Sequence, residues 1–149
     1  MNEERAKQLI KGVLTQKRFE HSLRVADVAK ELALRYGASV DNAVLAALLH
    51  DYAKCQPRDQ LKNQIIKYGL PQQLLQFHHE LWHGPVAAKV MEIDFGISDK
   101  HVLDAIYYHT TARASMSLLE VVIFVADYIE PQRNVPGIEE VRELATSNI

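Results

Sequence analysis

Along most of the chain, apolar residues recur at the spacing of amphipathic helices. Leu9, Ile10, Val13 and Leu14, for example, fall on one side of a helix. The same spacing continues between glycines, prolines and capping residues, so it predicts a series of helices. These cover residues 2–14, 18–37, 39–54, 58–69, 71–78, 83–96, 98–110, 117–131 and 137–149.

The ends of these predicted helices carry residues that commonly start or stop a helix. Gly37 is placed to close the second helix, Ser39 or Asp41 caps the third, and Ser98 caps a later one. Pro131 stops the most apolar helix. Part of that helix, "EVVIFVA", also fits a buried strand, but its length and its flanks favour a helix. We therefore predict an all-α domain, a bundle of helices.

Composition excludes several classes of protein. The chain has 149 residues, enough for one domain with a real core, and its formal net charge of −2 gives no basic footprint for bulk nucleic-acid binding. The single cysteine, Cys55, allows no internal disulfide, which fits a reducing cytosol. The charged first helix lacks the apolar core of a signal peptide, and no run approaches the roughly 20 apolar residues of a membrane span. We expect a cytoplasmic protein without nucleic-acid or membrane partners.

Six polar residues lie on apolar helix faces or at the ends of apolar helices. His21 shares a face with Val25 and Leu32, and Asp127 follows Ile123 on the most apolar helix. A lone histidine on such a face is more often a hydrogen-bonded core residue than a ligand. Together, however, the six would bury four imidazoles and two carboxylates at considerable cost. The set comprises His21, His50, Asp51, His83, His109 and Asp127.

A shared metal site would explain why these six polar residues lie on apolar helix faces. Imidazole nitrogens and carboxylate oxygens are ligands of transition metals, and a divalent cation offsets the desolvation of the carboxylates. The absence of thiolate ligands argues against a structural zinc site. The set suits either one octahedral ion with open positions or two ions that share Asp51 as a bridge. Two such ions with a water between them would form a site for hydrolysing phosphoesters or phosphoanhydrides.

The order of these residues resembles a known signature. His21, then His50-Asp51, then Asp127 matches the H…HD…D pattern of the HD-domain metal-dependent phosphohydrolases. Within that superfamily the chain is similar to the bacterial YqeK-like family, and His83 and His109 resemble the extra histidines of its binuclear members. Five ordered stretches carry the resemblance: "RFEHSLRVADVA", "LLHDYAK", "ELWHGPVAA", "AIYYHTTAR" and "VIFVADYIEPQR". It implies a single HD domain over residues 1–149.

The resemblance also implies an activity and a cofactor. YqeK-like proteins are symmetrical dinucleoside tetraphosphate hydrolases that convert diadenosine tetraphosphate into two ADP, with iron at the site. We expect one or two iron ions, with manganese, cobalt or another divalent transition metal as alternatives. By motif, the ligands of the principal metal are His21, His50, Asp51 and Asp127. His83 and His109 are expected to bind either a second metal or a phosphate, and the two alternatives stay open.

The expected chemistry is attack by metal-activated water, with Asp51 or Asp127 able to accept its proton. A tetraphosphate also needs charge neutralisation, and three cations stand close in sequence to the ligands. Lys54 lies one turn beyond His50, and we assign it a catalytic as well as a substrate-binding role. The further candidates for substrate binding are Arg18, Glu20, His83, His109, Thr110 and Arg133. Trp82 could stack on an adenine, although packing on the domain edge explains it equally well.

Two other functions fit the same residues. One is an HD phosphohydrolase that acts on deoxynucleoside mono- or triphosphates, which the ligand pattern alone does not separate from the first. The other is a non-catalytic nucleotide-sensing module, which is disfavoured because every ligand position is intact. The number of apolar helices favours a homodimer. YqeK-like proteins usually continue for some tens of residues, so we also expect a C-terminal helical extension that is absent from this chain.

Overall fold

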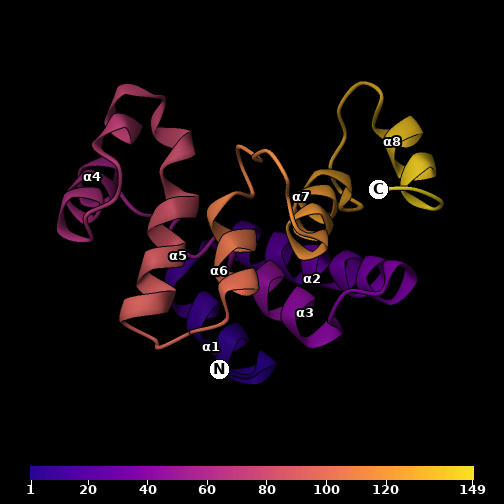
Figure 1. The fold of residues 1–149 in the computed structure, drawn as a ribbon, viewed down its shortest axis with the longest axis horizontal. Coiled ribbons are helices and arrows are strands. Elements are labelled where there is room, and N and C mark those ends of the chain that lie inside the picture. Colours follow the sequence, from indigo (N-terminus) through magenta and orange to yellow (C-terminus); the bar gives the residue numbers. More distant parts are fainter.

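The computed structural model describes residues 1–149, and every regular element in it is a helix (Figure 1). This confirms the predicted all-α class. The α-helices are α1 (Glu3–Val13), α2 (Gln16–Tyr36), α3 (Val40–Leu49), α4 (Arg58–Lys67), α5 (His83–Ile93), α6 (Lys100–Tyr107), α7 (Leu118–Ile129) and α8 (Ile138–Ala145). Two short 3-10 helices, η1 (Gln72–Gln76) and η2 (His79–Leu81), connect α4 to α5.

Helix α3 forms the centre of the bundle. It packs against α1, α2, α6 and α7, and its side chains at Ala43, Ala46, Ala47 and Leu48 are fully buried. The alanines let neighbouring helices approach closely, which explains why this short and nearly uncharged helix takes the central position. The residues that follow α3 therefore emerge in the middle of the molecule, between the surrounding helices.

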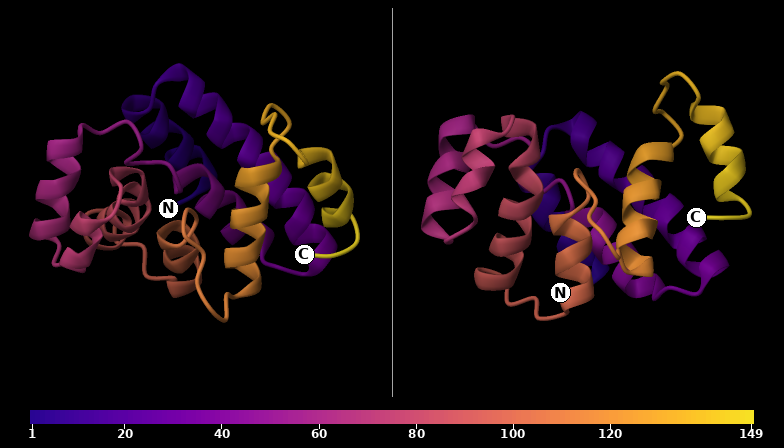
Figure 2. Two further views of the ribbon diagram at one scale, coloured as in Figure 1. Left: turned by 90° about the horizontal axis from the view of Figure 1, so that it is seen from above. Right: turned by 45° about the horizontal axis from the view of Figure 1, so that its top comes forward.

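The other helices are arranged around this centre in a consistent order. Helices α5 and α6 pack together, α6 packs on α7, and α7 contacts α8. Both views in Figure 2 show α7 between α6 and α8. The hydroxyl of Tyr36 at the end of α2 donates to the carbonyl of Ala145, which ties α8 to α2. None of the helices combines the length and the apolar character that crossing a bilayer requires.

Most predicted helix ends are confirmed. Gly37 closes α2 in the left-handed conformation, with φ of 87°, and the hydroxyl of Ser39 caps α3. The segment "EVVIFVA" lies in helix α7, so the helical alternative was right. Ser117 and Glu120 close a capping box at the start of that helix.

Several predicted boundaries were wrong, and the helices predicted to end at residues 96, 110 and 149 end at Ile93, Tyr107 and Ala145. Asp99, rather than Ser98, caps α6, because its carboxylate accepts hydrogen bonds from two backbone N–H groups of the first turn. Helix α3 ends at Leu49 instead of continuing to residue 54, and a series of turns follows. Residues 71–78 contain only the 3-10 helix η1. Each error comes from extending an apolar pattern beyond the point where local hydrogen bonding changes.

Candidate metal centre

The six polar residues singled out in the sequence meet at one place in the fold. His21 lies in the second turn of α2, His50 and Asp51 directly follow α3, and His83 begins α5. His109 lies two residues after α6, and Asp127 lies near the C-terminal end of α7. Five of the six are buried, and the side chain of Asp127 is 20% exposed. The fold thus gathers a cluster from five separate segments.

One half of the cluster is centred on Asp127. Its Oδ1 atom lies 2.9 Å from Nε2 of His21 and 3.4 Å from Nε2 of His50. One nitrogen or oxygen atom from each of these three residues lies within 4.8 Å of the others, which is close enough for all three to share a metal ion.

The other half is centred on Asp51. Its Oδ1 atom lies 3.3 Å from Nε2 of His83, 3.5 Å from Nε2 of His109 and 3.6 Å from Nε2 of His50. The facing Nε2 atoms of His83 and His109 are 3.1 Å apart. The second oxygen, Oδ2, faces His21 at 3.8 Å and pairs with the guanidinium of Arg18. The two oxygens of Asp51 therefore face different halves of the cluster.

Hydrogen bonds on the outer nitrogens orient the imidazole rings. Nδ1 of His50 donates to the carbonyl of Ala47, and Nδ1 of His109 donates to the carbonyl of Ile106 at 2.8 Å. A carbonyl oxygen can only accept, so Nδ1 carries a proton in each ring and Nε2 is the nitrogen that faces the cluster. Nε2 of His50 is buried and has no hydrogen-bond partner. A divalent cation would displace any proton from this nitrogen and bind its lone pair.

Glu130 orients His21 in the same way, and the sequence analysis missed it. Its Oε1 atom lies 3.2 Å from Nδ1 of His21, and its other oxygen accepts from Arg24 at 2.8 Å. Burial raises the pKa of Glu130, but the bonds from Arg24, the Gln132 backbone and His21 outweigh burial and hold it at about 2. Glu130 thus stays a carboxylate. In the sequence, Glu130 could have been found as an acidic residue one helical turn beyond the predicted ligand Asp127.

The electrostatics of the cluster also suit a cation. Burial lowers the pKa of His50, but the carboxylates of Asp51 and Asp127 outweigh it and raise that pKa to about 9. Conversely, the imidazoles hold the pKa of both carboxylates well below the ordinary range despite burial. The two aspartates are therefore anionic at neutral pH. Anionic oxygens and imidazole nitrogens without a thiolate are the donor set of a divalent transition metal.

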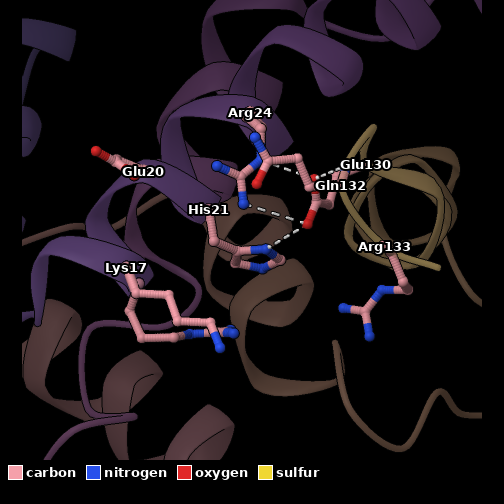
Figure 3. Close-up of a pocket in the computed structure, with 8 residues that line it drawn as sticks. Lys17, Glu20, His21, Arg24, Glu130, Gln132 and Arg133 are labelled. Carbon is pink, nitrogen blue, oxygen red and sulfur yellow. Dashed lines mark hydrogen bonds and ion pairs between the residues drawn. The ribbon is translucent and has the colours of Figure 1, made fainter.

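A basic cavity of about 190 Å³ opens beside His21, and we call it the His21 pocket (Figure 3). No apolar residue lines it. Figure 3 shows Arg133 entering from the connection after α7, opposite Lys17 and the ring of His21. Arg133 donates to the carbonyl of Asp127, and Arg18 reaches from the cavity wall to Asp51. The lining residues are Lys17, Arg18, Glu20, His21, Arg24, Glu130, Gln132 and Arg133.

Two more predicted residues lie elsewhere around the cluster. Lys54 forms an ion pair with Glu80 and lines a separate cavity beside His83. The Oγ1 atom of Thr110, next to His109, is buried without a hydrogen-bond partner. Among the predicted substrate contacts, Glu20 is exposed and accepts a bond from Gln16 at the rim of the His21 pocket.

The side chain of Trp82 packs inside the domain and is not available to stack on an adenine. Its side chain is 3% exposed, and its indole N–H donates to the carbonyl of Leu74 at 2.6 Å. A ring enclosed in this way presents no free face to an adenine. The structure therefore agrees with the packing interpretation of Trp82.

Gly84 permits the close approach of His83 to His109. A Cβ atom at this position would lie 2.9 Å from the carbonyl oxygen of Tyr107 and 3.3 Å from the ring of His109. Only a residue without a side chain lets the start of α5 pack directly on the end of α6. The His83–His109 half of the cluster depends on this contact.

Comparison with known proteins adds family information to this geometry. The HD domain family model matches residues 18–132, a span that contains all six cluster residues. A relative from Bacillus subtilis (strain 168), named bis(5'-nucleosyl)-tetraphosphatase, symmetrical, is 46% identical over the whole chain and 80% of its own length. A relative of the same name from Staphylococcus aureus is 45% identical over 97% of this chain and 75% of its own length.

A solved structure has the same fold. It is described as a predicted HD superfamily hydrolase involved in NAD metabolism from Clostridium acetobutylicum. The superposition has a TM-score of 0.90, covers 97% of this chain and 77% of the other, and the sequences are 36% identical.

Proposed function

This chain belongs to the HD domain family, and from that premise we propose that it is a symmetrical bis(5'-nucleosyl)-tetraphosphatase. It cleaves diadenosine tetraphosphate into two ADP. The observation that carries the proposal is the meeting of six metal-ligand side chains directly beside a cavity lined by four cations. The names of relatives at 46% and 45% identity supply the substrate.

The residues divide into two ligand groups around Asp51. His21, His50, Asp51 and Asp127 would hold the principal ion, and Asp51, His83 and His109 would hold a second one. The HD family and the donor set call for a divalent transition metal, and we propose iron. Such a cation supplies an acidified water at neutral pH and offsets the charge of the phosphates.

Of the two aspartates, Asp127 is the one beside the path by which the attacking water arrives and its proton leaves. Its side chain is 20% exposed, whereas that of Asp51 is 2% exposed and already surrounded by four imidazoles and Arg18. Asp51 therefore serves as the bridge between the two halves, and Asp127 faces the solvent from which water arrives.

Cations of the His21 pocket hold the negative charge of the substrate. Arg18 lines this pocket with His21. Figure 3 shows Lys17 and Arg133 on opposite sides of the His21 ring. Guanidinium groups bind phosphate oxygens through paired hydrogen bonds, which positions the chain as well as neutralising it. Lys54 contributes a further cation from the His83 side.

The reaction has a simple balance. The oxygen of water forms a bond to one of the two inner phosphorus atoms, and the bond from that atom to the central bridging oxygen breaks. The bridging oxygen leaves with the second ADP, and one proton is released past Asp127 to solvent. Because ADP is a good leaving group, no strong general acid is required on the departing side.

Product analysis tests the proposal directly. The metal-loaded protein is incubated separately with diadenosine tetraphosphate and with deoxynucleoside mono- and triphosphates, and the products are separated by chromatography. We expect ADP as the product of the first reaction. AMP and ATP as main products would contradict symmetrical cleavage, and faster turnover of the deoxynucleotides would favour the alternative HD phosphohydrolase. Binding without turnover of any substrate would favour the sensing module.

A further inference from the structure

A second basic cavity lies beside the metal centre, and we call it the His83 pocket. Its volume is about 170 Å³, close to that of the His21 pocket. Lys54 and Arg58 supply two cations, and His83 of the cluster forms part of its wall. The lining residues are Lys54, Gln56, Arg58, Leu61, His79, Glu80 and His83.

The two pockets flank the cluster and share no lining residue. The His21 pocket is built from α2 and the connection after α7, and the His83 pocket from α4, η2 and the start of α5. In Figure 1, α4 and α5 lie on one side of α6, and the connection between α7 and α8 lies on the other. His21 and His83 face different oxygens of Asp51, so this carboxylate lies between the pockets.

Arg58 is held where it can face an anion. Its guanidinium lies over the ring of Trp82, 5.7 Å from the centroid, and Trp82 itself is buried and hydrogen-bonded. This cation–π contact restrains a side chain that would otherwise move freely in solvent. No carboxylate pairs with Arg58 among the ion pairs of the protein, so its charge remains available to a ligand.

Lys54 is the second cation of this pocket, and its present partner, Glu80, is a largely exposed carboxylate. The side chain of Glu80 is 53% exposed, whereas that of Lys54 is 27% exposed. An exposed ion pair contributes little to stability, so a phosphate can displace Glu80 from Lys54 at low cost. The carboxylate then turns toward solvent.

We propose that the His83 pocket is a second phosphate subsite, in which Arg58 and Lys54 hold one diphosphate of the substrate while the His21 pocket holds the other. This inference rests on the proposed function and deepens it. A tetraphosphate that spans both pockets places its midpoint over the cluster. Central cleavage then follows from the position of the two subsites, and Arg58 becomes a specificity-determining residue.

Exchange of Arg58 for glutamine tests the second subsite. In the metal-loaded protein, Arg58→Gln is expected to raise KM for diadenosine tetraphosphate about tenfold, the effect of losing one charged hydrogen bond, with kcat little changed. The matched control is Lys62→Gln, because Lys62 is exposed on the same helix and lies outside the pocket. Both residues are exposed, so neither exchange threatens the fold.

The number of bound product molecules gives an independent measurement. Calorimetric titration with ADP is expected to show two ADP per chain for the wild type and for Lys62→Gln, and for Arg58→Gln a second ADP that binds about tenfold more weakly. One ADP per wild-type chain, or unchanged KM in Arg58→Gln, would overturn the second subsite. A wild-type protein that leaves diadenosine tetraphosphate intact would instead overturn the proposed function, so the two failures are distinguishable.

Discussion

Nδ1 of His21 lies 3.2 Å from Oε1 of Glu130, a residue 109 positions further along the chain. The other ring nitrogen of His21 lies 2.9 Å from Asp127, one turn before Glu130. The C-terminal end of α7 thus contacts both nitrogens of a histidine that belongs to α2. The orientation of His21 is set by α7, and this makes Glu130 a positioning residue for the metal centre.

Removing the Glu130 carboxylate should weaken metal binding. We expect Glu130→Ala to lower metal affinity about 10–100-fold, because His21 loses the acceptor that fixes its tautomer and its orientation. Glu130→Gln keeps an acceptor oxygen and should retain more affinity. Metal titration of the stripped protein measures both. Glu143→Gln, an exposed carboxylate without an ion pair, is the control. Wild-type affinity in Glu130→Ala would refute the positioning role.

Asp51 should be the least replaceable residue of the cluster. We expect Asp51→Ala to reduce hydrolysis by more than about 100-fold, the upper range for outer-shell partners, and to strip the metal. The reason is that Asp51 faces both halves, whereas His83 faces only one. His83→Ala should therefore lose less activity and less metal. Near-normal turnover of Asp51→Ala, with its helical content intact by circular dichroism, would contradict the binuclear arrangement.

Gly84→Ala should damage one half of the site selectively. The new Cβ would lie 2.9 Å from the backbone carbonyl of Tyr107, so α5 must move away from the end of α6. We expect weaker binding of the second metal equivalent and lower turnover, with the first equivalent bound normally. The control is Gly12→Ala in α1, where the added methyl group meets no atom within 4 Å. Equal metal stoichiometry in both variants would count against this dependence.

Metal content gives a direct test of the donor set. Protein isolated without a chelator should carry iron or another first-row transition metal, because six nitrogen and oxygen ligands converge without a thiolate. Treatment with a chelator should abolish hydrolysis, and iron, manganese or cobalt should restore it to different extents. Elemental analysis that finds only trace metal would speak against a resident ion.

Acidification should reveal the contribution of Glu120, which lies away from the metal centre. Burial raises the pKa of Glu120, but hydrogen bonds from Arg113 and Ser117 outweigh it and lower the pKa below 4.5. A lowered pKa in the folded protein stabilises the fold above the ordinary pKa, and that stability is lost as the pH falls through the lowered value.

The unfolding free energy of the wild type should therefore fall more steeply below pH 4.5 than that of Glu120→Gln. Denaturant unfolding at a series of pH values measures both slopes. Glu31→Gln, an exposed carboxylate on α2 without an ion pair, should keep the wild-type slope. Parallel profiles for wild type and Glu120→Gln would disprove the contribution.

The sequence predicts the helices and the cluster because both depend on local patterns. The apolar faces that carry His21 and Asp127 are visible as helical spacing, and His50-Asp51 ends an apolar run. Glu130 was missed because its contact with His21 spans 109 residues and follows a helix end with no distinctive spacing. The His83 pocket was missed because no sequence pattern shows that the turns after α3 and the start of α4 pack beside η2 and α5, which brings Lys54 and Arg58 to His83. The early end of α3 was not predictable from hydrophobicity alone.

The bonds from His50 to Ala47 and from His109 to Ile106 have one further consequence. Each histidine donates to a carbonyl three residues earlier, among the last four of α3 or α6, which lack partners within the helix. The orientation of these two rings is encoded in four consecutive residues and arises as soon as each helix end forms. His21 acquires its orientation only when α2 and α7 have docked. The orientations of His50 and His109 are therefore fixed by local structure, whereas that of His21 is fixed only when the tertiary structure is complete.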